Sequence, residues 1–183
     1  MNAVLTFVNA SDLRLAGRVR LWTPPRWVRL WMLWATTLGD GWLWLSVGFA
    51  LLDGGGRWRR VLAAAAIAAG VANIALVLLK RRFRRARPCD ASPHPAVTVR
   101  VSSYLRYVPS DRFSFPSGHS MNAFALATVL ALTFPWGAPL FLILAGSIAA
   151  SRFVLGLHYL SDVVAGSALG AIIGAAAYAA IVP

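Results

Sequence analysis

The chain has 183 residues, of which 58% are hydrophobic and only 13% are charged. A soluble domain usually has about 25% charged residues, so this composition excludes an ordinary soluble domain and indicates an integral membrane protein. The net charge of +12 would suit a nucleic-acid-binding protein. Because most of the chain is apolar, we attribute the charge to membrane lipids, a phosphorylated substrate or membrane orientation, and we expect no nucleic-acid partner.

Acidic and metal-binding residue types are scarce. All six acidic residues are aspartates, and the chain has three histidines and a single cysteine, Cys89. A two-metal phosphatase site requires several carboxylates, so we expect neither a metal site nor another cofactor. One cysteine excludes an internal disulfide, and Met1–Ala10 lacks the pattern of a cleavable signal peptide.

Residues 1–30 mix apolar residues with arginines and are interrupted by Pro24-Pro25. We expect this segment to lie in the membrane interface, where amphipathic indole rings act as anchors. The tryptophans concerned are Trp22, Trp27, Trp31 and Trp34. A first membrane span is expected within Trp31–Leu52. Gly39-Asp40-Gly41 indicates a break or a helix start there, and we expect Asp40 to cap a helix.

Four more spans follow from long uncharged runs, since about 20 apolar residues are enough to cross the hydrocarbon layer. They cover Val61–Leu79, about 119–134, about 138–156, and a last stretch from near Ser161 almost to the C-terminus. The sequence therefore predicts one all-α domain, residues 1–183. It is a membrane-embedded helical bundle with about five transmembrane helices, six being the alternative, and an N-terminal interfacial helix.

Two local patterns refine this bundle. Pro135-Trp136-Gly137-Ala138-Pro139 is a hairpin signal between the third and the fourth span. Gly166, Gly170 and Gly174 recur every fourth residue, which predicts a close-packed helix face. That face packs either inside the chain's own bundle or against a second copy in a homo-oligomer.

An odd–even count of the five spans places three polar stretches on one face of the membrane. They are the basic run after Leu79, the residues just before the third span, and Ser151–Asp162. All cationic residues except Arg57, Arg59 and Arg60 then lie on that face. Residues 89–118 form a polar loop that we expect to lie over it, with a short strand at 97–101. Three polar stretches that converge on one face predict a functional site.

The first of these stretches contains Lys80 and Arg87, seven residues apart. On a continuing helix their side chains point the same way, until Pro88 ends the helix. A lysine and an arginine together suit the oxygens of a phosphate. The cations between them are Arg81, Arg82, Arg84 and Arg85, which we interpret as ordinary juxtamembrane charges.

The second stretch, Pro116-Ser117-Gly118-His119, precedes an apolar helix. Ser117 can cap that helix, and Gly118 lets backbone N–H groups approach an anion closely. His119 would lie beside the anion, placed for proton transfer. The alternative is a capping serine followed by a solvated histidine.

The third stretch contains Arg152, His158 and Asp162. His158 and Asp162 are four residues apart, which on a helix lets the carboxylate accept the imidazole Nδ1–H. Such a bond fixes the tautomer and leaves Nε2 as a nucleophile or a base. The alternative is a helix-start pair that only closes a cap.

Taken together, the three stretches resemble the signature of a known family. Lys80-x6-Arg87-Pro88, Pro116-Ser117-Gly118-His119 and Ser151-Arg152-x5-His158-x3-Asp162 are similar to the three motifs of the type 2 phosphatidic acid phosphatase superfamily. That superfamily includes lipid phosphate phosphatases and vanadium haloperoxidases. Many of its membrane members have six spans, whereas five plus an interfacial segment are found in this chain.

The resemblance implies a role for each motif residue. His158 is expected to attack phosphorus and form a phosphohistidine, with Asp162 orienting it. His119 is expected to act first as general acid and then as general base. The residues expected to hold the phosphate oxygens are Lys80, Arg87, Ser117, Gly118 and Arg152.

The implied function is a metal-independent phosphatase for a lipid phosphate or diphosphate in a bacterial inner membrane. Candidate substrates are undecaprenyl diphosphate, phosphatidylglycerol phosphate, phosphatidate and a lipid A phosphate. Two alternatives are a phosphotransferase that uses the same phosphohistidine and a non-catalytic membrane protein that binds anions. The excess of cations on the motif-bearing face favours a cytoplasmic site, whereas the resemblance favours a periplasmic site, which we expect.

Overall fold

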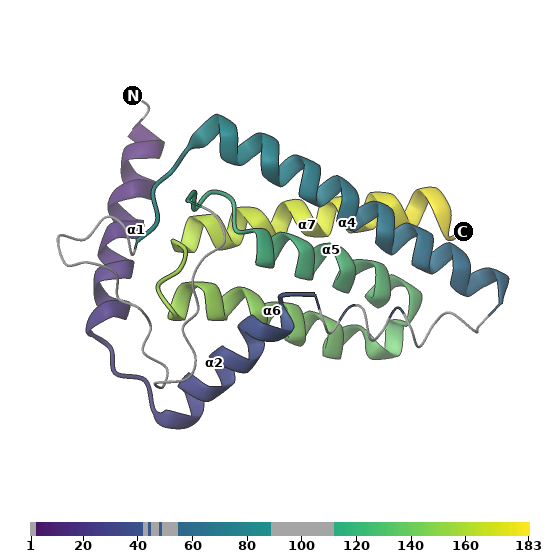
Figure 1. Cartoon of the computed structure of the whole chain (residues 1–183), viewed down its shortest axis with the longest axis horizontal. Coiled ribbons are helices and arrows are strands. Elements are labelled where there is room, and N and C mark those ends of the chain that lie inside the picture. Colours follow the sequence, from purple (N-terminus) through teal and green to yellow (C-terminus); the bar gives the residue numbers. More distant parts are fainter. Residues whose placement is uncertain (1–2, 42–43, 45–47, 49–54, 89–111) are drawn as a thin grey trace.

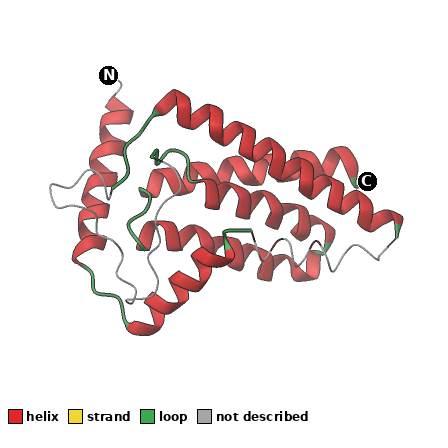
Figure 2. Cartoon of the chain, in the orientation of Figure 1, coloured by secondary structure: helices red, strands yellow, loops and turns green. Residues whose placement is uncertain are grey.

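The computed structural model describes residues 3–41, 44, 48, 55–88 and 112–183. Every regular element within these ranges is helical, so the all-α prediction is confirmed (Figure 2). The elements are α1 (Ala3–Leu21), α2 (Arg26–Leu38), α4 (Gly56–Phe83), α5 (Gly118–Thr133), the 3₁₀ turn η1 (Pro135–Gly137), α6 (Ala138–Val154) and α7 (Leu160–Ile181). The predicted strand at 97–101 and most of the predicted polar loop 89–118 lie outside the described residues.

Helices α4 to α7 form an elongated bundle, and α1 crosses one end of it (Figure 1). α7 packs along α4 and α5, and α5 also packs on α6. α2 lies against α6. The break predicted at Pro24-Pro25 is present, because residues 22–25 connect α1 to α2 without helix. The four tryptophans predicted as anchors are exposed, by 47% to 73% of their surface, as interfacial side chains would be.

In the described part of the chain, three helices are long and apolar enough to cross a membrane: Gly56–Phe83, Pro135–Val154 and Leu160–Ile181. α5 has 16 residues and lies among them, and at 1.5 Å per residue it is roughly 24 Å long. The break predicted near Asp40 is confirmed, since α2 ends at Leu38 and a turn follows. Most of the later part of that expected span lies outside the described residues, so a count of five remains a prediction.

The two ends of the bundle differ as the odd–even count requires. α4 ends, α5 begins, α6 ends and α7 begins at the end that α1 crosses (Figure 1). At the opposite end, the ring of Trp58 stacks on Phe134 with 5.3 Å between centroids, next to the predicted hairpin at Pro135–Gly137. The motif-bearing segments therefore share one end of the bundle.

The glycine face of α7 packs on the backbone of α5. A Cβ atom built on Gly166, Gly170 or Gly174 would lie well under 3.0 Å from a carbonyl oxygen of α5 or its N-cap. No real Cβ tolerates that distance, and backbone cannot move aside as a flexible side chain can. The predicted close-packed face is thus used within the chain, and it brings the start of α7 against the start of α5.

We expect Gly170→Ala to lower the free energy of unfolding by about 1–3 kcal/mol, because the added methyl group would force α7 away from Met121 of α5. The matched control is Gly146→Ala in α6, where a Cβ would meet no atom within 4 Å. Denaturation of both variants in the same detergent measures the difference. Equal effects of the two substitutions would contradict this packing.

Candidate active site

Three segments far apart in the sequence are in contact at the α1 end of the bundle. The backbone N–H of Ser117 donates to the carbonyl oxygen of Asp162 at 3.0 Å. Arg87 Nη1 donates to the carbonyl oxygen of Leu157, also at 3.0 Å. The carbonyl oxygen of Ser114 lies 2.7 Å from His158 Nδ1. The predicted convergence of the three stretches is confirmed.

His158 is buried, with 2% of its surface exposed, and its ring orientation is defined on both sides. A carbonyl oxygen can only accept a hydrogen bond, so the proton of the neutral ring lies on Nδ1, which donates to Ser114. Nε2 then carries the lone pair, and it lies 3.3 Å from Arg87 Nη1. The ring therefore presents an unprotonated nitrogen beside a cation that can hold a phosphate.

The acceptor of the His158 Nδ1–H hydrogen bond is the Ser114 carbonyl group and not the predicted Asp162 carboxylate. His158 lies in the loop before α7, which begins at Leu160, so the four-residue helical spacing does not apply. As a result, Asp162 Oδ2 is 3.8 Å from His158 Nδ1. At that distance the carboxylate acts on the ring through its charge.

Asp162 is fully buried and has several partners. Its Oδ2 accepts the backbone N–H of Tyr159 at 2.9 Å, which caps α7. Its Oδ1 accepts from Arg85 Nη1 at 2.7 Å. Asp162 therefore makes the cap that the alternative interpretation predicted, and it also binds Arg85.

Electrostatics keep the His158 ring neutral. Burial is the largest cause and lowers the pKa of His158 to about 4, helped by the charges of Arg87 and Arg152 and opposed by Asp162. At neutral pH the lone pair on Nε2 is therefore available. The same two arginines also act on His119, so both histidines lie within reach of one pair of positive charges.

The prediction that α4 continues to Arg87 is wrong. α4 ends at Phe83, and Arg84 adopts a left-handed conformation with φ 46°. The next two carbonyl groups bond to Ser114 rather than to a further helical turn. The Ser114 N–H donates to the carbonyl oxygen of Arg85 at 2.8 Å, and its hydroxyl donates to the carbonyl oxygen of Ala86 at 3.1 Å. Leaving the helix places Arg87 beside His158, while Lys80 stays buried in the last turn of α4.

Arg85 is not the ordinary juxtamembrane charge that the sequence suggested. Its guanidinium donates to Asp162 and to Asp12 of α1, both at 2.7 Å, and lies over the ring of Tyr159. Asp12 also accepts the backbone N–H of Ser161 at 3.1 Å. Arg85 thus joins α1 to the carboxylate that lies next to His158.

Ser117 is the N-cap residue of α5, as predicted, but its hydroxyl does not cap the helix. It accepts a hydrogen bond from the Ser120 hydroxyl at 2.9 Å. Gly118 begins the helix, and a Cβ there would lie 2.7 Å from the Leu76 side chain. The backbone at the start of α5 therefore packs closely against α4.

His119 follows in the first turn of α5. Its Nε2 lies 2.7 Å from Oδ1 of Asp40, in the turn after α2. Sequence reasoning assigned Asp40 only a capping role and missed this pair. No local pattern could have shown it, because the two residues are 79 positions apart.

Arg152 is buried near the end of α6. Its carbonyl oxygen accepts the backbone N–H groups of Leu157 and His158, both at 3.0 Å, so it shapes the loop that carries the histidine. Its Nη1 donates to the hydroxyl of Thr36 in α2. All eight residues predicted for the site lie in segments at this end of the bundle: Lys80, Arg87, Ser117, Gly118, His119, Arg152, His158 and Asp162.

Among the residues that the structure describes, no group of three or more His, Cys, Asp or Glu side chains is arranged to hold a metal ion. The cations and histidines at this end of the bundle suit an anion instead. The absence of a metal requirement remains a prediction, which a chelator tests below.

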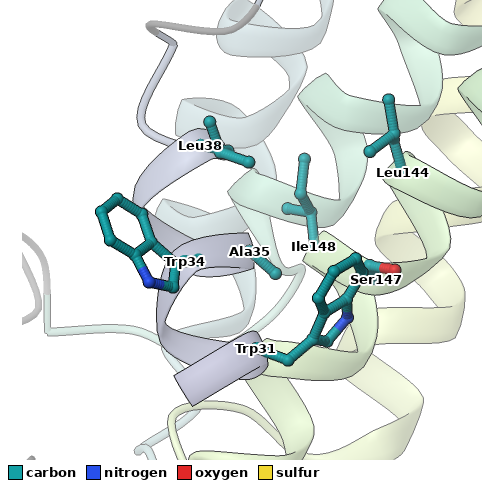
Figure 3. A pocket seen from close by; sticks show the side chains of 7 residues that line it. All are labelled: Trp31, Trp34, Ala35, Leu38, Leu144, Ser147 and Ile148. Atoms are coloured by element: carbon teal, nitrogen blue, oxygen red, sulfur yellow. The ribbon is translucent and has the colours of Figure 1, made fainter. Parts of the chain in front are cut away.

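An apolar groove lies between α2 and α6 (Figure 3). Its lining consists of Trp31, Trp34, Ala35, Leu38, Leu144, Ser147 and Ile148. Ile148 is one helical turn before Arg152, and Ala35 is next to Thr36. The groove therefore begins directly beside the hydrogen bond between Arg152 and Thr36.

A family model described as "PAP2 superfamily" matches residues 59–182. The chain belongs to the PAP2 superfamily. It is accordingly a membrane-bound enzyme of the phosphatase class, as the three motifs predicted.

Similar PAP2 proteins include two mycobacterial enzymes named decaprenylphosphoryl-5-phosphoribose phosphatase. The one from Mycobacterium tuberculosis is 41% identical over 136 residues, which are 74% of this chain and 68% of that protein. The one from Mycolicibacterium smegmatis is 40% identical over 168 residues, covering 90% and 80%. A lipid A 1-phosphatase of Rhizobium johnstonii is 38% identical over 95 residues, covering 51% and 37%.

Two crystal structures share the fold. One is a transmembrane PAP2-type phosphatidylglycerolphosphate phosphatase of Bacillus subtilis, with a TM-score of 0.70, 24% identity, and coverage of 98% of this chain and 86% of that chain. The other is Aquifex aeolicus LpxE, with a TM-score of 0.72, 21% identity, and coverage of 90% and 93%. The likeness confirms the predicted membrane bundle.

Proposed function

We propose that this PAP2 protein hydrolyses a lipid phosphate without a metal ion, through a phosphohistidine on His158. The observation that carries the proposal is the state of the His158 ring. Ser114 holds Nδ1–H at 2.7 Å, so the lone pair of Nε2 is directed to the side where Arg87 lies, 3.3 Å away. A neutral, oriented imidazole next to a buried guanidinium is what an in-line attack on phosphorus requires.

In the first step, Nε2 of His158 forms a bond to phosphorus as the bond to the leaving oxygen breaks. His119 gives that oxygen a proton, so the lipid or sugar alcohol departs neutral. The three cations Lys80, Arg87 and Arg152 hold the non-bridging oxygens, and the start of α5 supplies N–H groups. The charge of Asp162 stabilises the ring as it becomes positive.

In the second step, His119 removes a proton from a water molecule, and the water oxygen attacks phosphorus. The bond from phosphorus to Nε2 breaks, which returns His158 to its neutral state and releases inorganic phosphate. The proton gained by His119 is the one that serves the next turnover. No step requires a metal ion.

For the substrate, we propose a phosphomonoester on a polyprenyl-linked sugar. Two relatives at 40% and 41% identity are named for decaprenylphosphoryl-5-phosphoribose. The groove between α2 and α6 supports this choice, because it offers an apolar surface for a prenyl chain next to the phosphate site. The head group and the tail would then bind to two adjoining parts of one site.

A release assay with EDTA present tests this function. We expect the purified protein to free inorganic phosphate from a polyprenylphosphoryl-5-phosphoribose faster than from undecaprenyl diphosphate, phosphatidylglycerol phosphate, phosphatidate or lipid A. EDTA is expected to leave the rate unchanged, because the proposed site holds phosphate with arginine and lysine. Activity that disappears with EDTA and returns with a divalent cation would refute the mechanism.

We propose that the protein lies in a bacterial inner membrane with its site at the periplasmic face. An impermeant thiol reagent applied to intact cells tests the orientation, because Cys89 is the sole cysteine and follows Pro88 at the motif-bearing end. Labelling of intact cells is the expected result. Labelling only after cell lysis would place the site in the cytoplasm.

A further inference from the structure

The turn after α2 supplies a carboxylate to the proposed general acid. Asp40 Oδ1 lies 2.7 Å from His119 Nε2. A carboxylate can only accept, so Nε2 carries a hydrogen and donates it to Asp40. The bond fixes the tautomer and the angle of the His119 ring.

Contacts with two residues of the proposed site hold this turn in position. Thr36, one helical turn earlier, accepts a hydrogen bond from buried Arg152. Gly39 packs closely against the ring: a Cβ there would be 3.0 Å from His119 Cδ2 and 2.8 Å from Ile148 Cγ2. The sequence Thr36–Asp40 therefore contacts both a phosphate-holding arginine and a histidine of the site, although it belongs to none of the three motifs.

We propose that Asp40 is a positioning residue for His119 in the reaction proposed above, on which this inference rests. With Nε2–H bound to Asp40, the proton for the leaving oxygen moves from Nδ1 of the imidazolium to that oxygen. The negative charge of Asp40 stabilises the imidazolium before the transfer. After it, the neutral ring keeps Nε2–H on Asp40, and Nδ1 accepts the proton of the attacking water.

The Asp40–His119 pair contributes little to the free energy of unfolding, so removing it tests catalysis without unfolding the protein. The Asp40 side chain is 39% exposed and that of His119 is 21% exposed. Ion pairs at that exposure contribute about 0–1 kcal/mol to folding. Asp40→Asn is therefore expected to fold, and a thermal unfolding curve in detergent checks this.

The test compares two leaving groups. An alkyl phosphate needs a proton on its departing oxygen, whereas 4-nitrophenyl phosphate releases a weakly basic phenolate that does not. The parameter kcat/KM reports only the steps up to leaving-group departure. We expect Asp40→Asn to lower kcat/KM for the alkyl phosphate about 10- to 100-fold, a part of what general acid catalysis supplies, and to leave kcat/KM for the aryl phosphate nearly unchanged.

The control is Asp12→Asn, an equal change in another carboxylate at this end of the bundle that binds Arg85 and not His119. Asp12→Asn is expected to change kcat/KM for the two substrates by the same factor. Equal losses of kcat/KM for the two substrates in Asp40→Asn, or no loss for either, would overturn the positioning role. His158→Ala assayed beside them separates the two proposals: turnover by that variant would refute the phosphohistidine mechanism, whatever Asp40 does.

Discussion

His158→Ala is expected to lower kcat by about 10⁴-fold or more, since losing a nucleophile removes the covalent route and not one contact among several. Incubation with ³²P-labelled substrate, followed by a rapid quench in alkali, should yield phosphohistidine from the unmodified protein and none from the variant. Phosphate release at an undiminished rate by His158→Ala would eliminate the mechanism.

Two further variants make this result specific. His158→Asn retains an N–H that can donate to the Ser114 carbonyl group but has no nucleophilic nitrogen, so it should fold normally and be equally inactive. His94→Ala removes a histidine that belongs to none of the three motifs and should retain activity. Comparable losses in all three variants would show that the assay is reporting damage to the protein rather than loss of a nucleophile.

Asp162→Asn is expected to lower kcat by about 10²- to 10³-fold. As Nε2 bonds to phosphorus the ring becomes positive, and the carboxylate 3.8 Å from Nδ1 stabilises that charge. Two unit charges at about 4 Å contribute roughly 4 kcal/mol at an effective dielectric constant of 20, which sets the upper limit. In a serine-protease triad the same substitution costs about 10⁴-fold because the tautomer is lost as well. Here the Ser114 carbonyl group keeps the tautomer, so the loss should be smaller.

Steady-state kinetics of Asp162→Asn and Asp12→Asn measure this effect. Both substitutions exchange a carboxylate that binds Arg85 for an amide, but only Asp162 lies next to the His158 ring. Asp12→Asn should therefore lose much less activity. Identical losses would mean that the two carboxylates serve the Arg85 network alone and that the charge beside the ring has no catalytic role.

The bundle and the motif residues follow from the sequence for physical reasons that are visible in it. Long uncharged runs require membrane spans, and polar motifs at their ends require a site at one face. The glycine face of α7 was predictable because small residues at every fourth position have one common structural use. These are local patterns, and the structure confirms the helical bundle and the close packing of the glycine face.

The predictions that failed assumed helical spacing across a helix end. Arg87 and His158 both lie outside helices, where a four- or seven-residue interval does not define a direction. Ser114 replaces a helical partner in both places: it bonds to the carbonyl groups before Arg87 and accepts from His158. Every residue has a main-chain carbonyl group, so the residue type does not show which of these groups accepts a hydrogen bond from a distant side chain. Sequence patterns therefore could not have identified Ser114.

The missed contacts of Asp40, Asp12 and Thr36 have another cause. Asp40 meets His119 across 79 residues, and Asp12 meets Arg85 across 73. Each becomes informative only once α1 and α2 are placed against the bundle. Without that placement, an isolated aspartate near a glycine or an arginine is equally well explained as a cap or a surface charge.

The guanidinium of Arg85 donates both to Asp12 of α1 and to Asp162, the aspartate next to the His158 ring. Shortening the chain from its N-terminus past residue 12 would take one anion out of a cluster of two anions and one cation, so the remaining pair would become neutral. α1 contains none of the signature residues, yet through Asp12 it would contribute to the charge balance on which the proposed chemistry depends.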